Sequence, residues 1–154
     1  MNGKTLVAYF SASGVTAAVA KILAGTLGAD LHEIKPKDPY TAADLNWLDK
    51  HSRSTLEMTD PYSRPELAPE RIDLSGYQNI LIGYPVWWYV EPRIIDTFLE
   101  SYDFTGKTLI PFATSGSSGI ENSEESLKKH LPTGNWRPGK LLNFVTAAQW
   151  AKSL

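Results

Sequence analysis

Short, uninterrupted apolar runs alternate along the chain with stretches in which apolar residues recur every three or four positions. Runs of five or six apolar residues are too brief for a helix and are typical of strands buried on both faces of a sheet. These patterns predict strands at residues 6–10, 30–35, 79–84, 108–113 and 139–143. The strand at 30–35 is predicted from an alternating, more polar run. Helical spacing predicts helices at residues 15–27, 42–56 and 121–130, one that begins at Pro92, and a last one at 147–154.

This alternation of strands and helices is typical of an α/β fold. Because crossovers between parallel strands are right-handed, we expect a five-stranded parallel sheet with helices on both faces, in a single domain of residues 1–154. The strand at 30–35 is the most polar and is predicted at an edge. Between residues 59 and 69 three X-Pro pairs exclude regular structure, so this segment should run extended over an edge of the sheet.

The segment after the first strand has the features of an anion site. Residues 11–16 read S-A-S-G-V-T and lead directly into a predicted helix. A helix start has N–H groups without partners, its dipole favours an anion, and the hydroxyls and the glycine add donors and close backbone approach. No Lys or Arg lies between residues 5 and 16, so dipoles and hydroxyls would hold the anion. Taken alone, the segment fits an ordinary helix cap equally well.

Two further loops also follow the carboxyl ends of predicted strands. Residues 85–91, P-V-W-W-Y-V-E, place three aromatic side chains in a row, a large planar surface that needs a partner. By strand alternation we expect Trp87 and Tyr89 on one side and Trp88 on the other. Residues 114–119, T-S-G-S-S-G, are suited to hydrogen bonds with a heterocycle edge. Parallel α/β sheets bind ligands at this edge, so the three loops predict a nucleotide-like ligand with a broad ring system, and FMN fits best.

The amino-acid composition excludes several classes of function. With 42% hydrophobic and 21% charged residues, the chain has an ordinary globular composition. A formal net charge of −2 gives no basis for nucleic acid or an anionic membrane as a partner. The absence of cysteine excludes disulfides, thiolate metal ligands and cysteine nucleophiles. No apolar run approaches the ~18 residues of a membrane helix, so we expect a soluble, cytoplasmic protein.

The sequence lacks the residues that other chemistries known on similar folds need. The serine- and glycine-rich loop does not form G-x-S-x-G, because Ile120 stands where the second glycine is required. His32, His51 and His130 show no evident acid or nucleophile partner and no metal spacing. A phosphoacceptor domain needs acidic residues at the end of the first strand, and none is present there. We therefore expect no catalytic and no metal-binding residues.

The chain resembles the flavodoxin family, in particular its short flavodoxin-like oxidoreductase relatives, in element order over nearly its whole length. Residues 9–16, Y-F-S-A-S-G-V-T, are similar to the family's phosphate loop, S/T-x-S/T-G-x-T. Residues 83–88, G-Y-P-V-W-W, and 113–119, A-T-S-G-S-S-G, are similar to the two loops beside the isoalloxazine ring. The resemblance implies the strand order 2-1-3-4-5, FMN as cofactor, and these cofactor-binding residues: Ser11, Ala12, Ser13, Gly14, Val15, Thr16, Pro85, Val86, Trp87, Trp88, Tyr89, Thr114, Ser115, Gly116, Ser117 and Gly119.

The resemblance also implies electron transfer with a redox partner protein. Two departures keep an NAD(P)H:quinone-type reductase open as the alternative. Electron carriers of the family are typically strongly acidic, whereas the net charge here is −2. Residues 115–126 contain no aromatic side chain to cover the second flavin face, which would be open or covered by residues 40–69. An open face could admit a nicotinamide or a quinone for hydride transfer. A ligand-free interaction domain is the remaining alternative.

Overall fold

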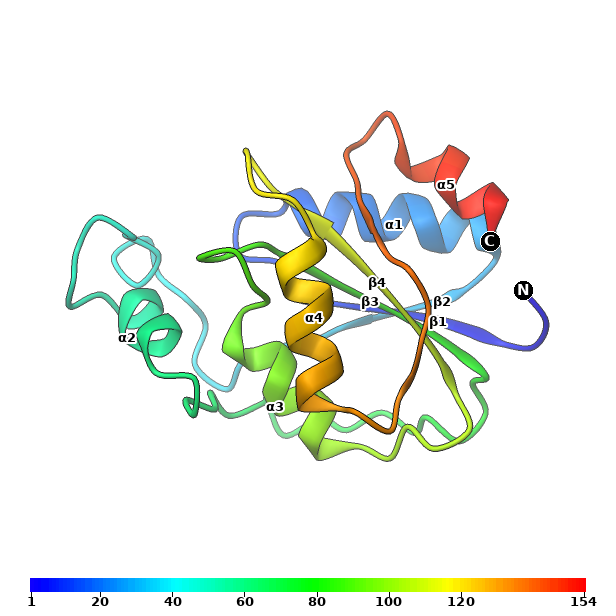
Figure 1. The fold of residues 1–154 in the computed structure, drawn as a ribbon, viewed down its shortest axis with the longest axis horizontal. Coiled ribbons are helices and arrows are strands. Elements are labelled where there is room, and N and C mark those ends of the chain that lie inside the picture. The colour runs from blue at the N-terminus through cyan, green and yellow to red at the C-terminus, as the bar shows by residue number, and fades with distance from the viewer.

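The computed structural model describes residues 1–154 and shows a parallel β-sheet between two layers of helices (Figure 1). The strands follow the order β2-β1-β3-β4, and β5 and β6 both pair with β4 at the far edge. The predicted parallel α/β sheet with the order 2-1-3-4-5 is confirmed. In chain order the elements are β1 (Thr5–Tyr9), α1 (Val15–Leu27), β2 (Asp30–Glu33), α2 (Arg53–Thr59), β3 (Asn79–Pro85), α3 (Arg93–Ser101), β4 (Thr108–Thr114), α4 (Glu121–His130), β5 (Asn135–Trp136), β6 (Lys140–Leu141) and α5 (Ala147–Ser153).

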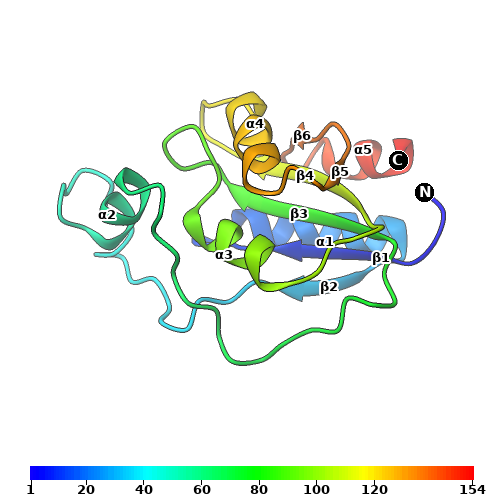
Figure 2. The ribbon, with the colours of Figure 1, turned by 60° about the horizontal axis from the view of Figure 1, so that its bottom comes forward.

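The central strands send alternate side chains to two separate hydrophobic cores. In β1, Leu6 and Ala8 belong to the core that also holds the apolar faces of α3 and α4. Val7 and Tyr9 belong to the core on the other side of the sheet, together with side chains of α1 and α5 (Figure 2). Because every residue of β1 is buried, the strand after Thr5 is a continuous run of apolar and aromatic residues rather than an alternating one.

Glycine determines both ends of α1, and its C-terminal end leads directly into the edge strand β2. Gly14 precedes the helix with φ 94° and Gly28 follows it with φ 62°, both in the left-handed region that only glycine enters at low cost. The long segment after α2 then runs beside β2, where Pro36 and Leu67 form an antiparallel bridge (Figure 2). This agrees with the expected extended course over a sheet edge. None of the helices combines the length and the apolar character needed to cross a bilayer.

The helix predicted at residues 42–56 is wrong for most of its length. Side chains bond the backbone in successive turns instead: Thr41 and Asp44 cap each other reciprocally, and Asn46 and Asp49 each accept an N–H two residues ahead. Such local hydrogen bonds compete with helix formation. The helix begins only after Ser52, whose hydroxyl accepts the Thr55 N–H group at 3.4 Å.

The fifth strand position is divided between two short strands, whereas the sequence predicted one strand at residues 139–143. β5 pairs with the start of β4 and β6 with its end. Pro138 lies between them, beside the part of β4 that contains Pro111, and neither proline has an N–H group for the ladder. A Cβ on Gly139 would lie 2.2 Å from the Pro111 carbonyl oxygen, and the Gly139 N–H group donates to Glu124 of α4 instead. The interruption therefore follows from the two prolines.

Candidate functional site

The three polar loops predicted from the sequence lie side by side at one edge of the sheet. They follow β1, β3 and β4, which are parallel neighbours and end at the same edge (Figure 1). The hydroxyls of Thr16 and Thr114, 98 positions apart in sequence, are 2.8 Å from each other and buried. The Val86 N–H group donates to the Thr114 carbonyl oxygen at 2.9 Å. Hydrogen bonds thus hold the three loops together.

The loop between β1 and α1 is shaped by one of its own hydroxyls. Ser11 Oγ accepts the N–H groups of Gly14 and Ala17, both at 3.1 Å. Gly14 is required by its conformation rather than by space, since a Cβ at this position would meet nothing within 4 Å. The Ser11 hydroxyl therefore orders the loop from inside, and the open side of the loop is bordered by backbone.

That open side carries donors without acceptors. The N–H groups of Ser13, Val15 and Thr16 have no hydrogen-bond partner within the chain, and Ser13 and Val15 are exposed. The first turn of α1 contains no acidic residue that would repel an anion. Unpaired N–H groups at the positive end of a 13-residue helix are suited to a phosphate dianion. The residues of this loop thus fit the phosphate of a nucleotide-like cofactor.

The aromatic loop after β3 is a tight, strained turn. Trp87 and Val90 exchange two backbone hydrogen bonds, at 2.9 and 3.1 Å. The two residues between them have positive φ, 47° for Trp88 and 70° for Tyr89. Bulky side chains in this region cost about 1–2 kcal/mol each, and such strain is retained mainly at functional sites. Because the chain reverses here, the side chains do not alternate as in a strand, and the predicted facing of Trp87, Trp88 and Tyr89 does not apply.

Trp87 is anchored against the core, whereas Trp88 and Tyr89 are free. The ring of Trp87 packs edge-on against Phe10 and against Tyr40, each at a centroid distance of 5.6 Å. Trp88 is 40% exposed and Tyr89 is 65% exposed. The structure therefore assigns the first aromatic residue to packing and leaves the next two available for a planar ligand.

A cavity of about 590 Å³ separates the aromatic turn from the third loop. Its lining consists of residues 86–89, residues 115–118, and Leu45, Trp47 and Ser54. The Ser115 hydroxyl accepts the N–H groups of Ser117 and Ser118, which curls this loop around its own side chain. The volume lies in the range of small-molecule and cofactor sites, and the walls combine aromatic surface with small polar groups. The cavity is therefore suited to a planar heterocycle.

A family comparison agrees with this geometry. The sequence profile of the Flavodoxin family matches residues 4–153, nearly the whole chain. The chain belongs to the flavodoxin family. Curated proteins gave no match to the sequence.

Solved structures include two proteins of similar sequence. A candidate flavoprotein from Bacteroides uniformis ATCC 8492 is 54% identical, with a TM-score of 0.94 and 99% of each chain covered. Another, from Bacteroides eggerthii DSM 20697, is 49% identical, with a TM-score of 0.95, 99% of this chain and 95% of that chain covered. A flavoprotein from Lactobacillus acidophilus NCFM, in complex with FMN, has 22% identity and a TM-score of 0.76, covering 97% and 99% of the two chains. The last similarity shows the fold alone.

Within this flavodoxin fold, the predicted cofactor-binding residues lie in the three loops and at the strand and helix ends beside them. Seven of them line the cavity: Val86, Trp87, Trp88, Tyr89, Ser115, Gly116 and Ser117. Residues 11–16 form the separate N–H-lined loop. Pro85 and Thr114 pair in the sheet behind both, and Gly119 lies one residue before the N-cap of α4. The fold brings all three groups to one edge, and cofactor contact by the individual residues stays a prediction.

Sequence reasoning missed the side chains that fasten the segment of residues 40–59 to this site. Tyr40 contacts Phe10 and Trp87, and its hydroxyl donates to Glu57. The Arg53 guanidinium lies 3.8 Å from the centre of the Tyr40 ring. Burial and the neighbouring Glu57 carboxylate raise the pKa of the Tyr40 hydroxyl, which therefore remains a donor. Only the clustering of aromatic residues in this flavodoxin sequence could have suggested the contact.

The Thr16–Thr114 hydroxyl pair yields a stability prediction. Thr16→Val should lower the free energy of unfolding by about 1–2 kcal/mol, because it leaves the buried Thr114 hydroxyl without its partner. Replacing both threonines with valine should cost less than the sum of the single changes. Urea denaturation of the two single variants and the double variant measures this, with the exposed Thr26→Val as the control. Additive effects would contradict a coupled pair.

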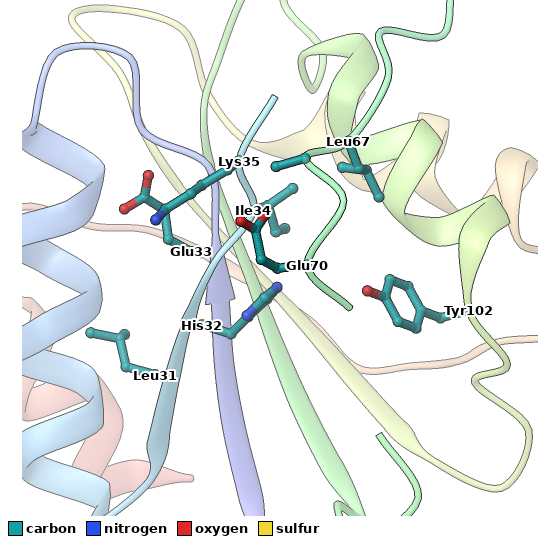
Figure 3. A pocket seen from close by; sticks show the side chains of 9 residues that line it. Leu31, His32, Glu33, Ile34, Lys35, Leu67, Glu70 and Tyr102 are labelled. Carbon is teal, nitrogen blue, oxygen red and sulfur yellow. The ribbon is translucent and has the colours of Figure 1, made fainter. Parts of the chain in front are cut away.

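A second cavity, of about 320 Å³, lies at the sheet edge between β2 and residues 67–70 (Figure 3). His32 and Glu70 extend into the space between strand and segment, and the Tyr102 hydroxyl points toward it. Burial lowers the pKa of His32, which favours its neutral form. None of the predicted cofactor-binding residues lines this cavity. It is a feature of the extended segment and separate from the three-loop site.

Proposed function

We propose that this protein binds FMN and acts in electron transfer. The cofactor's phosphate would lie against the N–H groups of residues 11–16, and its ring would lie in the cavity between the aromatic turn and residues 115–118. The observation that carries the proposal is the combination of unpaired N–H groups at the start of α1 with an aromatic cavity at the same sheet edge. The fold shared with the FMN complex from Lactobacillus acidophilus supports it.

In this arrangement the protein positions the cofactor and controls its surroundings. FMN, when bound, supplies the reversible uptake and release of electrons. The N–H groups of Ser13 and Val15 would hold the phosphate by dipoles, without a cationic side chain. Trp88 or Tyr89 would cover one ring face and exclude water from it, while the polar groups of residues 115–118 would orient the ring edge.

One observation favours an FMN-dependent NAD(P)H:quinone-type reductase as the second candidate. Trp47, which is 68% exposed, lines the cavity in addition to the aromatic turn. This additional exposed aromatic surface provides a place for a second planar molecule beside the flavin. A one-electron carrier that docks to a redox protein remains the first candidate.

Titration of the purified protein with FMN tests the proposal, with flavin fluorescence as the readout and riboflavin as the control ligand. Strong quenching by FMN and weak binding of riboflavin are expected, because riboflavin lacks the phosphate. Binding of neither ligand would overturn the proposal. Anaerobic mixing of the FMN-loaded protein with NADH or NADPH then separates the two candidates: rapid bleaching of the flavin indicates a reductase, and its absence indicates a carrier.

A further inference from the structure

A group of buried ionisable side chains lies outside the three loops, where the start of α3 meets the end of α4. Glu91 and Asp96 are 0% exposed, and His130 is partly exposed beside them. His130 Nδ1 lies 3.6 Å from Glu91 Oε2 and 3.6 Å from Asp96 Oδ1. Three oxygens of this group, Glu91 Oε1 and both carboxylate oxygens of Asp96, are buried without any hydrogen-bond donor. That His130 has acidic neighbours was not expected from the sequence, in which we found no acid partner for it.

The surroundings supply too little positive charge for two buried carboxylates. The only cationic side chain beside the pair is Arg93 of α3, whose Nη1 lies 3.8 Å from Asp96 Oδ2. The same guanidinium also donates to two backbone carbonyl oxygens, at 3.3 and 3.0 Å. From β3, the Tyr84 hydroxyl is engaged with Ser123 at 2.8 Å. Two ionised carboxylates would place two negative charges beside one guanidinium in the interior, where an unbalanced charge is strongly unfavourable.

A single proton balances this charge better than a metal ion does. His130 Nδ1 lies 2.8 Å from the Ser126 carbonyl oxygen, the geometry of an N–H donor, so its lone pair is not directed at a cation between the carboxylates. The Ser126 hydroxyl donates to Glu91 Oε2 at 3.0 Å, which leaves Glu91 Oε1 free to carry a proton. A carboxylate oxygen of Glu91 and one of Asp96 lie within 4.8 Å of each other. The remaining Asp96 carboxylate then pairs with Arg93. Burial and the neighbouring Asp96 raise the pKa of Glu91 to about 10.

Glu91 is also placed to act on the aromatic turn. It directly follows Val90, whose N–H and carbonyl groups close the turn onto Trp87. The turn holds Trp88 and Tyr89 in a strained conformation, and such strain persists only when the flanking structure holds it in place. One flank is anchored in the sheet through Val86, and the other flank is anchored through Glu91. Ionised Glu91 would be repelled by Asp96 and would loosen this second anchor.

We propose that Glu91 and Asp96 hold one proton between them. This shared proton keeps Glu91 in place and thereby stabilises the conformation of the aromatic turn beside the cavity. Glu91 is then a positioning residue, and the consequence for the cofactor rests on the proposed FMN binding. The folded chain keeps this proton at pH values where the unfolded chain has released it, so stability falls as pH rises from about 4.5 toward about 10. Relative to a variant that cannot ionise there, the unfolding equilibrium constant should rise by up to about tenfold per pH unit.

Glu91→Gln is the decisive variant, because its amide can donate to Asp96 and accept from Ser126 as the protonated acid does. Glu125→Gln removes the same charge from the exposed face of α4 and serves as the matched control. The first readout is the infrared C=O band of a protonated carboxyl group in cofactor-free protein at pH 7, with 13C-labelled glutamate. We expect the band in the wild type and in E125Q, and its loss in E91Q. A wild type without the band overturns the proposal.

The pH profile adds a readout that packing alone would not change. Urea unfolding between pH 6 and 10 should show the wild type losing stability relative to E91Q, whereas E125Q should follow the wild type. Asp96→Asn should move the decline to lower pH, because the opposing charge of Asp96 is gone. Parallel profiles for all variants overturn the proposal. So does a Zn²⁺- or Mn²⁺-dependent rise in the wild-type melting temperature that abolishes the acid band, since it would identify a metal site.

FMN binding tests the coupling to the turn. The ratio of the wild-type dissociation constant to that of E91Q should be about 1 at pH 7 and should rise to about 2 at the pH where half of Glu91 is ionised. Comparison at one pH cancels the ionisation of the flavin itself. A constant ratio overturns the coupling. Failure of every variant to bind FMN would overturn the proposed function instead, and the infrared and unfolding results would show whether the shared proton exists.

Discussion

Replacing Ser13 with aspartate should weaken FMN binding by at least about 30-fold and leave riboflavin binding nearly unchanged. Ser13 is exposed on the loop before α1, next to N–H groups that have no acceptor in the chain. A carboxylate at this position would face the phosphate dianion at short range. At the dielectric of a protein surface, like charges a few ångströms apart repel by about 2 kcal/mol or more, which corresponds to about 30-fold in affinity.

The matched control for this change is Ser13→Asn, which has the size of aspartate without its charge. Asparagine should lower FMN affinity by only a few-fold, so the difference between the two variants isolates the charge. High salt should recover part of the S13D loss, because it screens the repulsion. Fluorescence titrations with FMN and riboflavin at low and high salt measure all of these effects. Equal FMN affinity of the aspartate variant and the wild type would place the phosphate elsewhere.

Trp87→Ala should lower the free energy of unfolding by about 2–4 kcal/mol, whereas Trp88→Ala should change it by less than about 1 kcal/mol. Trp87 packs against Phe10 and Tyr40 and joins the segment of residues 40–59 to the end of the sheet. Its removal leaves a cavity at this junction, and a partly buried tryptophan lies at the lower end of the range for such truncations. Trp88 is 40% exposed and makes no such aromatic contact.

For FMN affinity we expect the reverse order, with the larger loss in the Trp88 variant. Loss of a planar stacking surface at Trp88 should weaken FMN binding by about 1–3 kcal/mol, with little change in the denaturation midpoint. For Trp87→Ala, the loss of stability should be present without FMN as well. Denaturation of the cofactor-free protein and FMN titration of both variants provide the comparison. A stable W87A protein with weakened FMN binding would show that Trp87 faces the ring.

The sequence by itself determined the sheet and the three loops at its edge. Buried parallel strands need apolar side chains on both faces, so the runs at β1, β3 and β4 could be recognised without any knowledge of their partners. Once the strands are parallel, the polar residues after each of them must lie at one edge. The glycine before α1 and the unpaired N–H groups that follow it are also local features, since they depend on residues within one turn of each other.

Only the tertiary structure decided which side chains meet. The facing of Trp87 and Trp88 predicted by strand alternation was wrong because the chain reverses there with positive φ. Bulky residues rarely adopt this conformation, so the sequence does not indicate it. The last strand position is divided where Pro138 and Gly139 meet the part of β4 that contains Pro111. The pairs Thr16–Thr114 and Glu91–His130 join residues far apart in the chain. Periodicity describes neighbours within a few positions, whereas packing brings distant polar groups together, so these contacts and their chemistry required the folded chain.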